Sequence, residues 1–594
     1  MGRQGLRKPS QTSLVYISQI ILALLATVWR FCTTLVIEET ESQCPDGSPS
    51  AETRNGTLCG LYLPELSQDV FLGVPYAQPP IGDLRLRHPR SFALKYQAYP
   101  ATAQPASCPG YGGFSTGIGP LSEDCLFVNV ARPHRDDEEP NPGLLPVLVW
   151  IYGGGYTGGG IADPRYNMSY IVEESAQLGK PIIAVSINYR LAGFGFLAAK
   201  EVMADGAANI GLFDQRLALG WIKENIISFG GDPNKITIWG ESAGAFSVAY
   251  QVMAFDGEHS DLFRAAIMNS GTMLGSKLQD RVTIGSPGGY QEAFNTIVES
   301  VGCVGSSDSL DCLRKLPYET LYTAFKPFIF TPVLDGDFLR TMPSESLKQG
   351  KYAAVSLLLG ANTDEGTATF WGPRGSLHTS EDVASYIATL SDGSFDSNDI
   401  DEVLALYPDE PSQGCPFGTG CERFAHHGEM YKRGAAIAGD CFVHAGRRHL
   451  AQIASSRMHP TNPAVFSYRF DQPPWNEIQP LIATEAPVYS THYTELSYIF
   501  HNPNPLLTNY IGPSSKHWAL SKTMCRMWIS FVHDLDPNNH GEIKLPRWPS
   551  YGSESFSNIV FRVSDSERRI EIEKDDYRSE QLRWWNRNWS KIRC

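Results

Sequence analysis

The stretch Lys235-Ile-Thr-Ile-Trp-Gly-Glu-Ser-Ala-Gly244 carries the signal that decides the fold. Its first half, 235–239, has the pattern of a buried strand, and residues 245–253 continue as a helix. Between them stands Gly-x-Ser-x-Gly, whose glycines let the chain turn sharply from strand to helix. The hydroxyl of Ser242 would then project from the edge of a sheet at a helix N-terminus. This context predicts that Ser242 is a nucleophile; the alternative is a tight turn in which Ser242 only caps the helix.

Short apolar runs on either side of this turn predict further strands. They are nearly continuous in Val, Ile, Leu and aromatic residues, which is typical of strands covered on both faces. The runs span residues 145–152, 181–189, 265–269, 355–360 and 464–470. Helical patterns lie between them, and the clearest begins at Asp214 as its N-cap. We therefore expect an α/β fold with a mostly parallel central sheet, helices on both faces, and ligands at the carboxyl ends of the strands.

Length and charge narrow the class of protein. The chain has 594 residues, of which 42% are hydrophobic, so it can bury a large core. Its 49 Lys and Arg residues and 64 Asp and Glu residues give a net charge of −15, the wrong sign for a nucleic-acid partner. No internal repeat or long low-complexity linker follows Gln43, so we expect one catalytic domain over residues 44–594. The 54 glycines and 40 prolines predict large loop insertions in that domain.

Residues 1–43 are expected to form an N-terminal targeting segment and a short leader. Basic residues between 3 and 8 precede the uncharged apolar run 14–29, which is the layout of a secretory signal peptide. An uncleaved signal anchor is the alternative, although the run is shorter than a comfortable membrane span. We expect a secreted protein; the alternative is a membrane-anchored protein whose catalytic domain is lumenal or extracellular.

The twelve cysteines fit an oxidising compartment. Cys303 and Cys312 bracket a small polar loop and predict a local disulfide, and Cys108 and Cys125 bracket a glycine-rich loop in the same way. Sequons for N-glycosylation, which are usable in the secretory pathway, occur at Asn55, Asn167 and Asn588.

One cluster raises the question of a metal site. Cys415, Cys421, His426 and His427 are residue types that bind zinc, but the two histidines are not spaced as in a zinc site. A Cys415–Cys421 disulfide is the favoured interpretation. We expect no metal ion.

A serine nucleophile needs an oxyanion hole as well as a base and an acid. The glycines 153–155 follow the strand 145–152, and residues without side chains let backbone N–H groups approach a developing oxyanion. Gly154 and Gly155, together with Ala243 after the nucleophile, are the predicted donors. The same segment matches the dinucleotide pattern Gly-x-Gly-x-x-Gly, but residues 159–164 do not begin a helix that would hold a pyrophosphate.

Four blocks stand in one order along the chain: Gly73-Val-Pro-Tyr-Ala-Gln-Pro-Pro80, Glu123-Asp-Cys-Leu-Phe-Val-Asn129, Phe229-Gly-Gly-Asp-Pro233 and Gly240-Glu-Ser-Ala-Gly244. Together they resemble the type-B carboxylesterase/lipase family, and the chain is similar to its secreted, fungal-like members. The resemblance covers about residues 70–531. It implies the α/β-hydrolase fold, a small-molecule carboxylic ester as substrate, and no cofactor. It also implies a structural ion pair between Arg85 and Glu123.

The resemblance further implies the acid and the base. Glu365 matches the family's acid at a strand end, and the neighbouring Asp364 is the alternative. His492 matches the family's His-x-x-Glu block and follows the acid in the chain, as the order Ser, acid, His requires. His492 would take the proton of Ser242 to form an acyl-enzyme, which water then hydrolyses. Glu241 is expected to be a buried hydrogen-bonding residue and not a second acid.

Two departures from the family pattern bear on the substrate. Tyr152 stands where relatives often have His before the three glycines, and this leaves the backbone donors unchanged. The loop from Cys108 to Cys125 is short, rich in glycine and without Trp, which argues against the amphipathic lid of lipases and against a choline site. We expect short- to medium-chain or bulky apolar esters. The alternatives are a true lipase or sterol esterase, and a non-catalytic adhesion module of the same fold.

Overall fold

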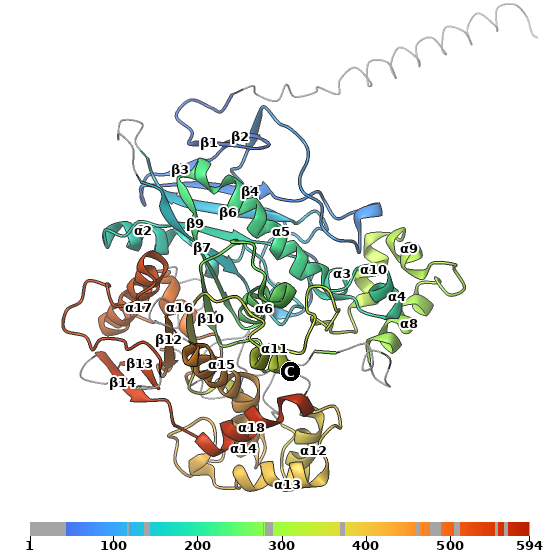
Figure 1. Ribbon diagram of the computed structural model, residues 1–594, viewed down its shortest axis with the longest axis vertical. Coiled ribbons are helices and arrows are strands. Elements are labelled where there is room, and N and C mark those ends of the chain that lie inside the picture. Colours follow the sequence, from blue (N-terminus) through green and yellow to red (C-terminus); the bar gives the residue numbers. More distant parts are fainter. Residues whose placement is uncertain are drawn as a thin grey trace, which may run out of the picture.

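The structure is a computed structural model with a large twisted sheet at its centre and helices packed around it (Figure 1). It describes residues 43–115, 118–135, 143–276, 278–279, 285, 289–368, 375–457, 464–475, 489–503, 511–552, 556–563 and 568–592. The predicted targeting segment therefore lies, up to residue 42, outside the described residues.

Eleven strands form the main sheet in the order β14-β13-β12-β11-β10-β9-β7-β8-β6-β4-β3. The strands from β8 to β13 pair in parallel, and the outer pairs are antiparallel. The strands of this sheet are β3 Leu61–Leu63, β4 Gln68–Pro75, β6 Phe127–Pro133, β7 Leu145–Ile151, β8 Ile183–Ile187, β9 Gly231–Glu241, β10 Ala265–Asn269, β11 Ser356–Asn362, β12 Val465–Phe470, β13 Ser557–Val563 and β14 Arg568–Lys574. A second, small sheet contains β1 Ser50–Thr53, β2 Gly56–Cys59 and β5 Ala98–Pro100.

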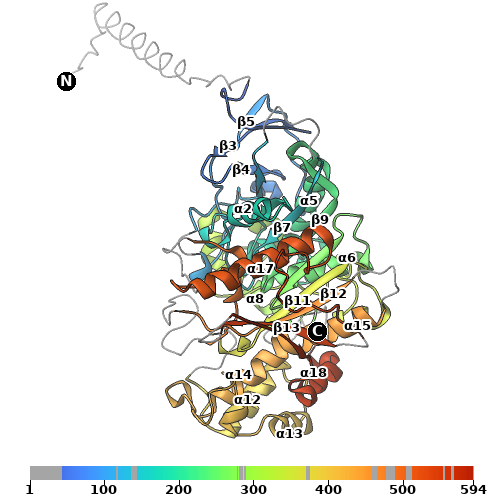
Figure 2. The same cartoon turned by 90° about the vertical axis from the view of Figure 1, so that its left-hand side faces the viewer.

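Helices cover both faces of the main sheet, as the α/β-hydrolase fold requires. Figures 1 and 2 show α2 and α17 on one face and α5, α6 and α15 on the other, and Figure 1 shows α16 beside α17. A further group, α12 to α14 with α18, lies at one end of the molecule. The helices are α2 Ser169–Gln177, α3 Ala192–Phe196, α4 Lys200–Ala204, α5 Ile210–Asn225, α6 Ala243–Gly257, α8 Tyr290–Ser300, α9 Ser309–Arg314, α10 Tyr318–Phe325, α11 Pro343–Gln349, α12 Ser380–Leu390, α13 Ser397–Leu406, α14 Tyr431–Gly439, α15 Ala445–Ser456, α16 Glu495–Phe500, α17 Ser515–Asp534 and α18 Ser579–Ile592.

The predicted start of one helix is wrong. We expected Asp214 to cap a helix, but α5 begins at Ile210, with Asn209 in the left-handed region as its N-cap. Asp214 is fully buried, and its carboxylate accepts hydrogen bonds from Arg190 Nε (2.8 Å) and Nη2 (2.7 Å). An aspartate is suited both to an N-cap and to a buried ion pair. Which of these roles Asp214 has depends on Arg190, which is distant in the sequence.

Buried aromatic rings fix α16 against the middle of the sheet. Trp150 on β7 and Trp239 on β9 are opposite each other, with ring centroids 4.4 Å apart. Phe500 of α16 stacks on Trp239 at 4.8 Å and meets Trp150 edge-on at 5.1 Å. Aromatic pairs of this kind add to the stabilisation from burial itself. The helix that follows His492 is therefore held firmly on the strands that lead to the candidate site.

Three disulfides join cysteines of the described residues. Cys108–Cys125 and Cys303–Cys312 are two of them, and Cys44–Cys59, which the sequence did not single out, is the third. The predicted Cys415–Cys421 disulfide is wrong, because both cysteines are free. The Sγ of Cys415 is buried and lies 3.7 Å from Asp364 Oδ1, whereas Cys421 is exposed.

The three glycosylation sequons differ in accessibility. Asn55 is 8% exposed, and its side-chain amide donates to the carbonyl oxygens of Phe92 and Leu94, both at 2.9 Å. A glycan on that nitrogen would have to displace these bonds, and glycosylation at Asn55 stays a prediction. Asn588 is half-buried on α18, and Asn167 is exposed, so glycosylation at these two positions stays a prediction.

Within the described part of the chain, none of the helices combines the length and the apolar character needed to cross a membrane.

Candidate active site

The turn between β9 and α6 is sharp and sterically demanding. Ser242 has φ 56° and ψ −127°, a strained conformation for a residue with a side chain. A Cβ at Gly240 would lie 2.3 Å from the backbone of Gly244, and a Cβ at Gly244 would lie 2.1 Å from the carbonyl oxygen of Ile151. The backbone N–H of Ser242 donates to Asn269 O at 3.0 Å. Glycine is therefore required at both ends of the motif, and the serine hydroxyl is set at the carboxyl edge of the sheet.

The three glycines after β7 lie against this turn. A Cβ at Gly153 would be 2.5 Å from Glu241 O, so the two segments are in direct backbone contact. Gly154 and Gly155 have φ values of 103° and 63°, in the region that glycine occupies without strain. Both residues line the same cavity as Ser242 and Ala243. The predicted oxyanion donors are thus brought to one place.

Tyr152, the residue before the three glycines, is held by a second tyrosine. The Tyr152 hydroxyl donates to Tyr189 O at 3.1 Å, and the Tyr189 hydroxyl donates to Tyr152 O at 2.8 Å. Their rings stack with centroids 4.6 Å apart, and both side chains are fully buried. This reciprocal pair fixes the backbone from which the glycine loop begins.

The candidate base and acid are in direct contact. His492 Nδ1 lies 2.6 Å from Glu365 Oε2, and Glu365 Oε1 accepts a hydrogen bond from Asn362 N at 2.7 Å. Glu365 follows β11, and both side chains are at most 2% exposed. A buried charge-assisted hydrogen bond of this length holds the imidazole in one orientation.

The alternative acid, Asp364, is directed elsewhere. Its Oδ1 accepts a hydrogen bond from Phe417 N at 2.9 Å and lies beside the thiol of Cys415. Burial raises the pKa of Asp364 to about 7, and the negative charge of Asp471 adds to this effect, while the bond from Phe417 opposes it. The geometry therefore favours Glu365 as the partner of His492.

Two more carboxyl groups are buried beside this pair. Glu241 Oε1 lies 3.0 Å from His492 Nε2, and burial followed by repulsion from Glu365 raises the pKa of Glu241 well above its usual value. Glu495 Oε2 accepts a hydrogen bond from Asn362 Nδ2 at 2.6 Å, and burial, then the charges of Glu241 and Glu365, raise the pKa of Glu495 to about 8. Both groups therefore favour the protonated form at neutral pH. The sequence predicted Glu241 as a buried polar residue but not its approach to the base, and Glu495 was visible only as the last residue of the His-x-x-Glu block.

A cavity of about 610 Å³ opens over these residues. Ser242 and His492 line it, together with Gly154 and Gly155. The remaining walls are mostly apolar and include Phe246, Phe442 and Ile329, of which Ile329 is 67% exposed. Such a cavity suits the apolar part of a small ligand placed beside the serine.

The cysteine and histidine cluster that the sequence raised does not form a metal site in the described residues, which contain no group of three or more His, Cys, Asp or Glu side chains arranged to hold a metal ion.

The chain is similar to known proteins over most of its length. Residues 47–585 match the model of the carboxylesterase family. The chain is 35% identical over 579 residues to secreted lipase 1 of Botryotinia fuckeliana, covering 90% of this chain and 92% of that protein. It is 33% identical over 579 residues to the secreted triacylglycerol lipase LIP1 of Gibberella zeae, covering 92% of this chain and 90% of that protein.

Solved structures show the same likeness. The structure of Aspergillus niger EstA superposes with a TM-score of 0.78 at 28% identity, over 92% of this chain and 99% of that one. A thermophilic PNB esterase superposes with a TM-score of 0.71 at 27% identity, over 91% of this chain and all of the other.

Proposed function

We propose a catalytic role for each residue of this cavity, from the premise that the chain belongs to the carboxylesterase family and is a carboxylic-ester hydrolase. Ser242 is the nucleophile, His492 the general base and Glu365 the acid that orients the imidazole. The observation that carries the proposal is the 2.6 Å contact between Glu365 and His492 next to a cavity that Ser242 and His492 both line. Because the chain is a carboxylic-ester hydrolase, we do not propose the alternative of a non-catalytic adhesion module.

The first half of the reaction forms the acyl-enzyme. His492 Nε2 accepts the hydroxyl proton as Ser242 Oγ attacks the ester carbonyl, and Glu365 stabilises the resulting imidazolium through Nδ1. The carbonyl oxygen becomes negatively charged and is bound by the backbone N–H groups of Gly154, Gly155 and Ala243. His492 then returns its proton to the leaving alcohol, and the carbonyl re-forms as an acyl ester of Ser242.

The second half repeats the steps with water. His492 removes a proton from a water molecule, the hydroxide adds to the acyl carbon, and the same three N–H groups bind the oxyanion. Collapse of the intermediate releases the carboxylic acid and returns the proton to Ser242. Neither half requires a cofactor.

The substrates we propose are short- to medium-chain or bulky apolar esters. The cavity volume and its apolar walls suit an acyl group of modest size. The disulfide loop 108–125 supports the same choice, because in its described residues the helical part is only Gly113–Ser115. The loop is also tied down: Tyr111 OH donates to Tyr322 O at 2.7 Å, and Tyr322 OH donates to Gly110 O at 2.9 Å. These bonds favour a fixed rim over a flap that opens on a lipid surface.

The second candidate is a true lipase. It is favoured by the relatives from Botryotinia fuckeliana and Gibberella zeae, which are named as secreted lipases. The same relatives, with three disulfides in this structure, support secretion as the location.

Two experiments test the proposal. A fluorophosphonate should label the wild-type enzyme and leave Ser242→Ala unlabelled; equal labelling of both would place the nucleophile elsewhere. Hydrolysis rates across p-nitrophenyl esters from acetyl to palmitoyl should be greatest at short or middle lengths. A sharp rise in rate above the solubility limit of a long-chain ester would replace the esterase with the lipase.

A further inference from the structure

A second cavity, of about 370 Å³, lies among α13, α14 and the start of α18. These helices belong to the group at one end of the molecule in Figure 1. None of the residues that line this cavity also lines the catalytic one. It is large enough for a small organic ligand.

One buried arginine at this cavity, Arg433, has no acidic partner among the residues that the structure describes. Arg433 is 8% exposed, and its guanidinium donates to Tyr407 O, to Leu404 O (2.7 Å) and to Ser380 Oγ (3.1 Å). A guanidinium has five N–H groups, so these bonds leave part of its donor capacity unused. Among the described residues, no carboxylate lies within ion-pair distance of Arg433. Burial lowers the pKa of Arg433 and the charge of Asp409 only opposes this, so the positive charge is poorly compensated.

A second arginine lines the same cavity, but its charge is neutralised. Arg578 Nη2 lies 2.7 Å from Asp440 Oδ1, and its Cζ is 4.1 Å from the centroid of the Phe417 ring. Although burial opposes the charged form, Asp440 raises the pKa of Arg578 above its usual value. Arg578 therefore contributes a fixed guanidinium and an aromatic contact without adding net charge.

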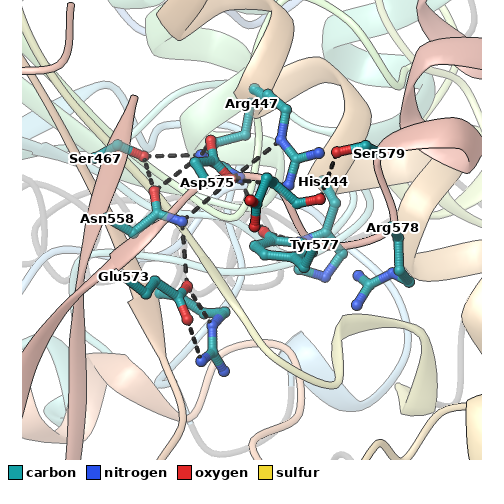
Figure 3. A network of polar contacts seen from close by, with 12 residues as sticks. His444, Arg447, Ser467, Asn558, Glu573, Asp575, Tyr577, Arg578 and Ser579 are labelled. Carbon is teal, nitrogen blue, oxygen red and sulfur yellow. Dashed lines mark hydrogen bonds and ion pairs between the residues drawn. The ribbon is translucent and has the colours of Figure 1, made fainter. Parts of the chain in front are cut away.

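A polar network fixes the segment that carries Arg578 (Figure 3). Asp575 accepts hydrogen bonds from Arg447 Nη1 (2.6 Å) and Nη2 (2.8 Å) and from Arg448 Nη2 (2.9 Å). Arg447 Nη2 also donates to the Tyr577 hydroxyl at 2.8 Å. Several buried bonds from arginine to this segment keep the backbone from 575 to 578 in one place. The side of the cavity that Arg578 lines is thus held in place.

The rest of the lining is mostly uncharged. Leu406, Ala436 and Phe417 supply apolar surface, and none of the described residues that line the cavity is an aspartate or a glutamate. One uncompensated positive charge beside apolar walls is complementary to a monoanion with an apolar tail. Inorganic phosphate would carry too much charge and leave the apolar walls without a partner.

We propose that this cavity binds an organic monocarboxylate, with the carboxylate at Arg433 and Arg578 and the tail along Leu406 and Ala436. The acids that a carboxylic-ester hydrolase releases belong to this chemical class. The site is close to the catalytic machinery, because the backbone N–H of Phe417 donates to Asp364, the residue before Glu365.

The test is titration calorimetry of the full-length enzyme with hexanoate, and with inorganic phosphate and hexanol as comparison probes. Gln413 is exposed, lines the cavity, and its side chain makes no hydrogen bond within the described residues, so Gln413→Glu adds a negative charge there without disturbing the bonds of Arg433. We expect a hexanoate site that Gln413→Glu weakens about ten-fold, the effect of one like charge near a half-exposed anion. Gln97→Glu, an exposed change of the same charge outside the cavity, is the matched control and should bind as the wild type does.

Binding of hexanoate at the catalytic cavity does not confuse the result, because Gln413 does not line that cavity. The proposal is overturned if no hexanoate site responds to Gln413→Glu, if both variants weaken binding equally, or if hexanol binds as tightly as hexanoate. Binding of phosphate but not hexanoate at the responsive site would overturn the carboxylate assignment. Arg433→Lys, which keeps the charge but not the forked donors, should weaken hexanoate less than Arg433→Met does.

Discussion

Replacing Glu365 by Gln tests the assignment of the acid most directly. Glu365 accepts two hydrogen bonds, from His492 Nδ1 at 2.6 Å and from Asn362 N at 2.7 Å, and it is fully buried. A glutamine can accept only through its oxygen. If its NH₂ group faces Asn362, two donors oppose each other; if it faces His492, the imidazole must carry its proton on Nε2 and can no longer accept one from Ser242.

Either arrangement removes the stabilisation of the imidazolium. The corresponding substitution in a serine protease triad lowers kcat by about 10⁴-fold, so we expect Glu365→Gln to lower kcat by about 10³- to 10⁴-fold, or about 4–5.5 kcal/mol in the barrier. KM should change little, because the glutamate does not line the substrate cavity. The assay is hydrolysis of p-nitrophenyl butyrate, with thermal melting to establish that the variant is folded.

Asp364→Asn is the matched control for this prediction. The asparagine oxygen can still accept the hydrogen bond from Phe417 N, and Asp364 is half protonated near pH 7 in any case. We expect kcat within about three-fold of the wild type, because the group has no contact with His492. A Glu365→Gln variant that keeps more than a tenth of the wild-type kcat, or a large loss of kcat in folded Asp364→Asn, would refute the assignment.

Three further predictions concern stability. Gly240→Ala places a Cβ 2.3 Å from the backbone of Gly244 and should lower the free energy of unfolding, measured with denaturant, by about 3 kcal/mol. Gly220→Ala in α5 is the control: its Cβ meets nothing within 4 Å, so the change should be neutral or stabilising. Similar values for the two variants would contradict the steric argument. Arg85→Met removes the buried partner that lies 2.6 Å from Glu123 and should lower the free energy of unfolding by about 3–5 kcal/mol. Glu123→Gln in the same chain should restore only part of this loss, because Arg85 Nη1 also donates to the carbonyl oxygens of Arg314 and Leu316. An additive double mutant would argue against the ion pair. The pKa of Asp364 is raised to about 7 in the folded state, so the folded protein keeps a proton that the unfolded chain releases near pH 4, and this group lowers the free energy of unfolding as pH rises from about 4 to 7 but not beyond. The free energy of unfolding of Asp364→Asn, measured as a function of pH, should lack this decrease. If the wild type and Asp364→Asn depend on pH in the same way, the raised pKa of Asp364 is wrong.

Much of the fold could be predicted because its signals are local. The strands 265–269 and 464–470 were expected from continuous apolar runs and form β10 and β12, within one residue of the predicted ends. The sharp turn at Ser242 could be predicted because Gly-x-Ser-x-Gly follows a strand and precedes a helix, and steric exclusion at Gly240 acts over only a few residues. The wrong predictions concern residues whose partners are distant in the sequence. Cys415 has a cysteine six positions away in the sequence, but packing places its thiol against Asp364.

The sequence by itself determined the strand, turn and helix around Ser242, the glycine loop that precedes it in the chain, and the order of the site residues. These follow from backbone sterics and from patterns within short segments, so they need no knowledge of the rest of the chain. Only the tertiary structure decided that Glu365 and not Asp364 meets His492, and that Glu241 lies 3.0 Å from the same imidazole. The two acidic neighbours have the same local pattern, and which of them reaches the histidine depends on how β11 packs against the segment before α16, more than a hundred residues later in the chain.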